Sequence, residues 1–141
     1  MKTASRGFSL LELLIVVAFI LIIATIAVPS LLRSRQVANE ASAVANMRNI
    51  AQAEISFGAS RGGTFGTIND LSTNGLIDNR FVAGGVVSGY TFAVTSGFAT
   101  FTVHADPAGM SGRYNYSVNE DGILRYNTMV PTGFAPGEVI K

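Results

Sequence analysis

RGFSLLELLIVVAFILIIATIAVP, residues 6–29, is the stretch that decides the fold of this chain. A short basic leader ends at Gly7, and a long apolar run begins at Phe8 and contains one acidic residue, Glu12. From Leu13 to Leu32 no residue is charged, which makes a run of twenty. A helix of that length spans roughly 30 Å, the thickness of the hydrocarbon core of a bilayer. The stretch therefore predicts a helix that spans a membrane.

A cleavable secretory signal is the first alternative for this stretch. Such a signal has an apolar region of about 7–15 residues, followed by a cleavage site made of small residues. Ala24, Ala27 and Ser30 loosely imitate that site, but the apolar run here is longer. The length therefore favours an anchoring helix over a conventional signal peptide.

The charge balance excludes one class of function. The 141 residues carry a formal net charge of +1, and without Lys2 and Arg6 eight basic residues stand against nine acidic ones, a charge of −1. A nucleic-acid-binding domain needs a basic face, so we expect no nucleic-acid partner. Arg33 and Arg35 flank the other end of the run, so the positive-inside rule leaves its orientation open. The lack of cysteine excludes a disulfide scaffold, a thiolate metal site and a cysteine nucleophile.

Pro29 lies near the end of the apolar run. A proline inside a helix removes a hydrogen bond and clashes with the preceding turn, so a kink is expected there, or a stop at Val28. Against a stop, an amphipathic pattern resumes at once and alanine is abundant. Its apolar residues are Leu31, Leu32, Val37, Ala41, Val44, Ala45, Ile50, Ala51, Ile55 and Phe57. We therefore predict one helix over about residues 8–57, bent near Pro29 and stopped by Gly58.

Glu12 is the anomaly of the apolar run. A charged group deep in a membrane-spanning helix costs roughly 2.5–3.5 kcal/mol on insertion scales. Either Glu12 lies near the membrane interface, where water reaches it, or it meets a positive group inside an assembly. If the chain is cut after Gly7, Phe8 gains an α-amino group four residues before Glu12. A neighbouring copy could present that amine to Glu12, which would also set the axial register between the two copies.

The residues from Gly7 to Val17, GFSLLELLIVV, resemble the class III leader and N-terminal helix of type IV pilins and type II secretion pseudopilins. The signature is a glycine, then an aromatic residue, then a glutamate four positions on, all at the start of a long apolar helix. Phe8, Glu12 and Pro29 fall where that family has them. The resemblance covers about residues 6–30 and is highly specific.

The resemblance implies a life cycle that composition did not show. A prepilin peptidase would cut between Gly7 and Phe8, and the new amine of Phe8 would be methylated. The helix would hold the subunit in the inner membrane as a single span, with the globular part outside the cytoplasm. An assembly platform and a motor protein of that membrane would then move subunits into a helical filament. There Glu12 would pair with a neighbour's N-terminus, and the helix would loosen near Pro29.

The residues after the helix predict a small antiparallel sheet. Residues 58–66 read as a loop, and residues 67–73 as a short helix capped by Thr67 or Asn69 and ended by Asn74-Gly75. Alternating patterns and turn residues then predict four strands, at residues 90–95, 98–104, 113–118 and 123–126. Turns are expected at 96–97 and 119–122, and Ala105-Asp106-Pro107 is expected to break the second strand. Residues 127–141 are not placed by the pattern.

We therefore predict an α+β fold of pilin-like architecture. Residues 1–7 form a leader that is removed. Residues 8–57 form the long helix, with a protruding apolar half (8–30) for the membrane and the filament core, and an amphipathic half (31–57) packed on the sheet. Residues 58–141 form the globular head.

An enzyme would need a constellation of chemical groups that the sequence does not offer. His104 is the single histidine and lies in a predicted strand, so we expect no catalytic residue. Asp106, Glu120 and Asp121 fall short of the 6–8 oxygens of a calcium site, so no metal or other cofactor is predicted. Asn115-Tyr116-Ser117 matches a glycosylation triplet, but its serine is expected within a strand. We expect Arg33, Arg35 and Arg48 to solvate the helix or to pair with Glu40 and Glu54.

Two filament systems fit these observations. The first is a type IV pilus, in which the chain would be an extracellular structural subunit. The second is a type II secretion system, in which it would be a periplasmic pseudopilin. A third reading, from another class, is a single-pass anchored binding domain that never polymerises. The resemblance over residues 6–30 does not separate the first two systems, because pilins and pseudopilins share this signature.

Overall fold

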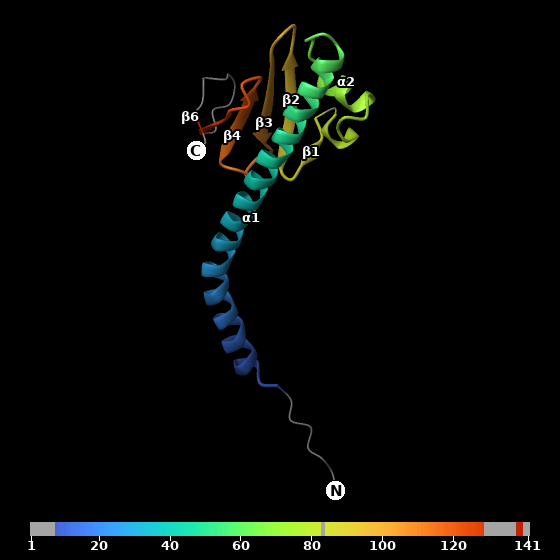
Figure 1. Ribbon diagram of the computed structural model, residues 1–141. Coiled ribbons are helices and arrows are strands. Elements are labelled where there is room, and N and C mark those ends of the chain that lie inside the picture. Colours follow the sequence, from blue (N-terminus) through green and yellow to red (C-terminus); the bar gives the residue numbers. More distant parts are fainter. Residues whose placement is uncertain (1–7, 83, 129–137, 140–141) are drawn as a thin grey trace. The chain divides into compact units, whose positions relative to one another are not determined.

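The computed structural model describes residues 8–82, 84–128 and 138–139 (Figure 1). The chain divides into two compact units, Met1–Ser34 and Arg35–Lys141. Helix α1, Leu10–Ser60, contributes its first part to one unit and its second part to the other.

The first unit is the apolar part of α1. The helix begins at Leu10, two residues after the predicted start, and continues through Pro29. Pro29 has no N–H, so the carbonyl of Thr25 receives no helical hydrogen bond from that position. The Thr25 hydroxyl donates to the Ile22 carbonyl at 2.7 Å. The continuous helix is confirmed, and the bend near Pro29 stays a prediction.

The helix ends at Ser60 and not at Gly58. Gly58 is buried inside the helix, where a Cβ would lie 2.7 Å from the ring of Phe65. The glycine is thus needed for close packing and not as a helix stop. The chain turns only afterwards, at Gly62 and Gly63, which both have positive φ.

A short helix follows the loop, as predicted. Helix α2 spans Ile68–Thr73, and Thr67 is its N-cap. The Thr67 hydroxyl accepts from the Asp70 N–H, and the Asp70 carboxylate accepts from the Thr67 N–H, which is a capping box. Asn74 is the C-cap. A 3₁₀ turn, η1 at Asn79–Phe81, comes next and was not predicted.

The described residues of the second unit contain a six-stranded sheet in chain order, with every neighbouring pair antiparallel. Its strands are β1 Val86–Val87, β2 Tyr90–Ser96, β3 Phe101–Pro107, β4 Tyr114–Asn119, β5 Leu124–Thr128 and β6 Glu138–Val139. The predicted meander corresponds to β2 to β5. The two outer strands, of two residues each, gave no readable alternation in the sequence.

The second predicted strand is displaced in the structure. Strand β3 begins at Phe101, because residues 97–99 pair with the loop after α1. The Gly97 carbonyl accepts from Phe65 N–H, and Thr64 bridges to Phe98. The strand also runs through the predicted break and ends at Pro107. Pairing with β4 ends at Ala105, so the missing N–H of the proline falls at a strand end, where it is tolerated.

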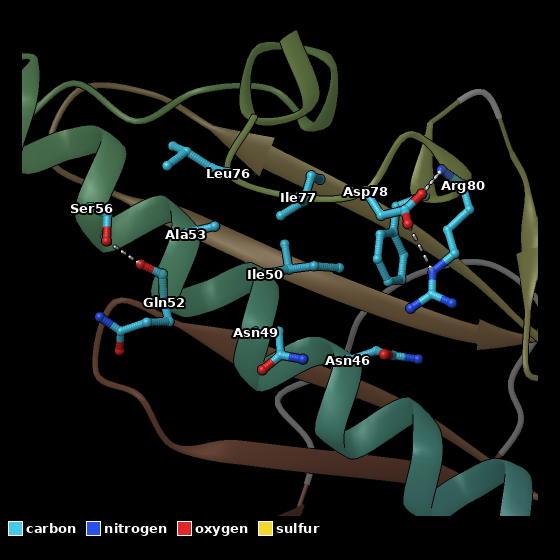
Figure 2. A pocket seen from close by; sticks show the side chains of 11 residues that line it. Asn46, Asn49, Ile50, Gln52, Ala53, Ser56, Leu76, Ile77, Asp78 and Arg80 are labelled. Atoms are coloured by element: carbon cyan, nitrogen blue, oxygen red, sulfur yellow. Dashed lines mark hydrogen bonds and ion pairs between the residues drawn. The ribbon is translucent and has the colours of Figure 1, made fainter. Parts of the chain in front are cut away.

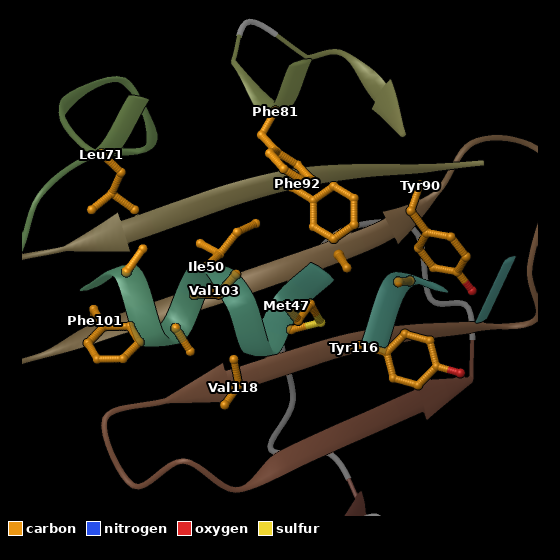
Figure 3. Packing of buried hydrophobic residues seen from close by; sticks show 14 of the residues in the cluster. Met47, Ile50, Leu71, Phe81, Tyr90, Phe92, Phe101, Val103, Tyr116 and Val118 are labelled. Carbon is orange, nitrogen blue, oxygen red and sulfur yellow. The ribbon is translucent and has the colours of Figure 1, made fainter. Parts of the chain in front are cut away.

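The core lies between α1 and one face of the sheet (Figure 3). Met47 and Ile50 of α1 are fully buried against it. The strands contribute every second residue, including Tyr90, Phe101 and Val103, all at most 2% exposed. Each large apolar side chain buried in this way stabilises the fold by about 1.5–3 kcal/mol. This long helix on an antiparallel sheet is the α+β fold expected from the sequence.

The predicted apolar stripe of the helix is only partly the buried face. Ile50, Ala51 and Phe57 are buried, whereas Val37 and Ile55 are 52% and 46% exposed. The buried face also includes two carboxylates and an amide, at Glu40, Glu54 and Asn46. The two carboxylates are accommodated because the head supplies backbone donors, Arg113 N–H to Glu40 and Gly66 N–H to Glu54, which hydrophobic periodicity cannot reveal.

Candidate assembly site

Of the residues predicted to direct processing and assembly, the structure describes Phe8, Glu12 and Pro29. Gly7, the predicted cleavage position, lies outside the described residues. Phe8 is 81% exposed, so its side chain is available to a peptidase or a neighbour. Glu12 stands in the first turn of the helix, which begins at Leu10.

Glu12 has a local partner that the sequence analysis missed. Its Oε2 accepts a hydrogen bond from the backbone N–H of Ser9 at 3.0 Å, and the Ser9 carbonyl accepts the first helical bond, from Leu13 N–H. Ser9 is therefore the N-cap, and Glu12 supplies the carboxylate half of a capping box. The S-x-x-E spacing of Ser9 and Glu12 was the signal that could have revealed it. A carboxylate here also gains about 0.3–1 kcal/mol from the helix dipole.

The apolar segment, residues 8–32, exposes large side chains on every side of the helix. Phe19, Leu21 and Ile23 are 62%, 61% and 65% exposed, and successive positions point in different directions around the axis. The helix is long and apolar enough to cross a membrane, and none of its most apolar stretch is buried within the chain. This agrees with the membrane-spanning helix expected from composition.

The head holds α1 through a set of polar contacts that we call the clamp. It joins Gln36, Asn39 and Glu40 of α1 to the β3–β4 connection, residues 108–113. Gln36 Nε2 donates to the Met110 carbonyl at 2.9 Å, and Asn39 Nδ2 donates to the Ser111 carbonyl at 2.9 Å. Asn39 and Glu40 follow Gln36 by three and four residues, so all three side chains lie on one side of the helix. About one turn of α1 therefore carries the clamp.

Glu40 and Arg113 form the charged part of the clamp. The Glu40 carboxylate accepts from the backbone N–H, Nε and Nη2 of Arg113 at 2.9, 3.0 and 2.8 Å. Hydrogen bonds from Arg113 hold the pKa of Glu40 below its ordinary value. The expected pairing of Glu40 with Arg33, Arg35 or Arg48 is therefore wrong, because the sheet brings Arg113 to it.

Glu54 is the second carboxylate on the buried face of α1. It is fully buried, and its Oε2 accepts from the Gly66 N–H at 3.0 Å. Its Oε1 has no hydrogen-bond partner among the described residues. Burial raises the pKa of Glu54 above its ordinary value, and the neighbouring Asp70 carboxylate adds to the shift. The expected pairing of Glu54 with an arginine is wrong as well.

The other candidate groups lie in structural contacts. His104 is half-buried in β3, and burial lowers its pKa. Asp106 accepts a hydrogen bond from Asn115 at 2.6 Å, and Asp121 forms an ion pair with Arg125 at 2.5 Å. Within residues 8–82, 84–128 and 138–139 no cluster of three histidine or acidic residues could hold a metal ion.

A recess in the head lies between α1 and the segment from Leu76 to Phe81 (Figure 2). Its volume is about 450 Å³. Asn49 and Gln52 line it from the helix, and Asp78 and Arg80, whose charged groups are 3.9 Å apart, line it from the facing segment. Carboxamides and one ion pair can bind polar groups, but the lining places no nucleophile beside a general base.

Comparison with known proteins finds no matching family model, no matching curated protein and no matching solved structure. The assignment of function therefore rests on the residues and on their geometry.

Proposed function

We propose that this chain is a structural subunit that anchors in the inner membrane through its apolar segment and then polymerises into a type IV pilus filament. The observation that carries the proposal is the apolar segment itself. Its large side chains are 46–81% exposed from Phe8 to Leu32 in the isolated chain. A helix that is apolar all round must be covered by lipid or by other helices.

A filament core offers the apolar segment the same surroundings as a bilayer. Covering a large apolar side chain contributes about 1.5–3 kcal/mol, so exposure of the whole segment to water would be prohibitive. When identical helices pack side by side, they cover this apolar surface. The segment can then move from the bilayer into the bundle without being exposed to water. Contacts between different faces of identical subunits generate a helical fibre when the rotation from one subunit to the next does not close a ring.

Glu12 gives the bundle a polar contact that fixes its register. One carboxylate oxygen accepts from Ser9 N–H, which leaves Oε1 to receive a second donor. After cleavage behind Gly7, the α-amino group of Phe8 on a neighbouring subunit is such a donor. An ion pair in apolar surroundings is strong only when both charges are matched, so an unpaired subunit is disfavoured and an assembled one is stabilised.

Two measurements test this function. Mass spectrometry of the native protein should give a mature N-terminus at a methylated Phe8, and Gly7→Val should leave the uncut chain in the membrane. An intact Met1 terminus on native protein would overturn the proposal.

Electron microscopy of material sheared from cells should show long fibres that contain this subunit. Fibres that appear only when the subunit is overproduced, with none on normal cells, would favour the secretion pseudopilin. A processed chain that never forms fibres would indicate a non-polymerising anchored domain.

A further inference from the structure

The β3–β4 connection carries Met110, which is 86% exposed, the highest value among the large apolar residues described in the second unit. Gly109, with φ of 63°, turns the backbone just before it. A single exposed apolar residue is ordinary on a protein surface and needs no explanation by itself. What distinguishes Met110 is the part of α1 to which its backbone is bound.

Met110 is held beside the turn of α1 that follows the apolar segment. Its carbonyl accepts from Gln36 Nε2 at 2.9 Å, and the next carbonyl, of Ser111, accepts from Asn39. Gln36 is four residues from Leu32, the last residue of the uncharged run. Four residues span at most about 14 Å, so chain length alone keeps Met110 close to the end of that run.

The charges around the clamp favour an anionic surface. Glu40 is the one acidic residue between positions 13 and 53 of the sequence, and Arg113 neutralises it through the clamp. Arg33 and Arg35 therefore remain as positive charges just after the apolar segment. Basic residues that border a membrane span are attracted to anionic lipid headgroups.

We propose that Met110 and the β3–β4 connection form a membrane contact: when the apolar segment spans a bilayer, the Met110 side chain inserts among the anionic lipid headgroups that Arg33 and Arg35 attract. This inference rests on the membrane anchoring in the proposed function, but not on filament formation. Methionine suits this place because its unbranched, flexible thioether adapts to irregular apolar surroundings. The contact would hold the head at the membrane until the subunit leaves the bilayer.

The chain contains no cysteine, so one introduced thiol can report on this contact. The full chain is reconstituted at one copy per lipid nanodisc containing phosphatidylglycerol. A fluorophore sensitive to polarity is attached to Met110→Cys, or to Phe98→Cys as a control. Phe98 is 79% exposed and precedes β3, whereas Met110 follows it. The two labels are thus separated by a seven-residue strand, about 20 Å.

We expect the label at position 110 to show a blue-shifted emission and quenching by a lipid that carries a quencher at headgroup depth. The label at position 98 should show neither. Replacing phosphatidylglycerol with phosphatidylcholine, or introducing Arg35→Gln, should reduce the quenching at position 110.

Equal, solvent-like emission from both labels in chains that co-elute with the discs would overturn the membrane contact and leave the proposed function intact. A shift at position 110 that needs two copies per disc and ignores the lipid quencher would overturn it in favour of a second subunit. Chains that fail to enter the discs at all would overturn both the contact and the proposed anchoring.

Discussion

Glu40 of α1 and Arg113 of the β3–β4 connection are joined by three hydrogen bonds across 73 positions of sequence. Glu40 is 7% exposed, so its charge depends on this partner. The pair ties the helix to the sheet five residues after Arg35, where the second unit begins. It therefore defines where the head takes hold of α1.

The first prediction concerns this pair. Glu40→Gln keeps one oxygen for the Arg113 N–H but gives Nη2 a donor in place of an acceptor. The free energy of unfolding should fall by about 1–2 kcal/mol, below the full value for a charged hydrogen bond because the arginine is half exposed. Urea unfolding of the full chain in detergent micelles, followed by tyrosine signals, measures the change.

Asp121→Asn is the matched control for Glu40→Gln. It breaks the ion pair with Arg125 in an exposed turn, where solvent screens the charges, so little change is expected. An equal loss of unfolding free energy in Glu40→Gln and Asp121→Asn would show that the clamp stabilises the fold no more than an exposed ion pair does.

The second prediction is a pH dependence set by Glu54. Burial raises its folded pKa above the unfolded value, so the native state binds more protons. Its contribution is therefore fully present below the unfolded pKa and is lost as the pH rises through the folded pKa. Glu40 acts in the opposite direction: its folded pKa is lowered, so its stabilisation is present above the unfolded pKa and is lost as the pH falls.

Glu54→Gln separates these two contributions. The amide keeps an acceptor for the Gly66 N–H and carries no charge, so the loss of stability above the unfolded pKa of the acid should disappear. Unfolding midpoints in urea, measured from mildly acidic to mildly basic pH, test this. The variant should equal or exceed the wild type at neutral pH, and an unchanged pH profile would show that Glu54 does not titrate there.

The third prediction concerns Gly112, which lies in the β3–β4 connection under Tyr90. A Cβ at this position would overlap the phenol oxygen of Tyr90, which donates to the Tyr114 carbonyl at 3.0 Å. Tyr90 is fully buried and has no room to move. Gly112→Ala should therefore destabilise the head by about 1–3 kcal/mol.

Gly97→Ala provides the comparison for Gly112→Ala. Its nearest contact would be Thr100 at 4.0 Å, so the substitution should be tolerated. Thermal melting in the same detergent measures both variants. Similar melting temperatures of the two variants would show that the Tyr90 side chain can move to accommodate the added methyl group.

The fourth prediction separates the two roles of Glu12. Glu12→Gln retains an oxygen for the Ser9 N–H but loses the charge, whereas Glu12→Ala loses both. Both variants should insert into the membrane, and both should fail to assemble if the carboxylate pairs with a neighbour's amine. Fibre yield after shearing, normalised to the membrane-bound subunit, is the measurement. Normal yield from Glu12→Gln alone would assign Glu12 to capping and remove the ion pair from the assembly.

Sequence periodicity predicted most of the fold. The long helix, the capped helix after Thr67 and the four central strands follow from local residue preferences and alternation, which act over a few neighbouring positions. The start of β3 and the end of α1 were displaced because the decisive contacts, Thr64 with Phe98 and Gly58 with Phe65, join segments distant in sequence or across a turn. Of the assembly site, the residues were predicted, but the hydrogen bond from Ser9 to Glu12 was not.

By itself the sequence determined the apolar segment, its single carboxylate and the period of each strand, because hydrophobicity and backbone preference are properties of local residues. Only the tertiary structure decided which charged side chains are buried and which partners they have. Glu40 and Glu54 read as surface residues of a helix, yet one is matched by Arg113 and the other is buried against Gly66. The reason is physical: a carboxylate can be buried only where the rest of the chain brings it a donor, and that donor comes from a different part of the fold.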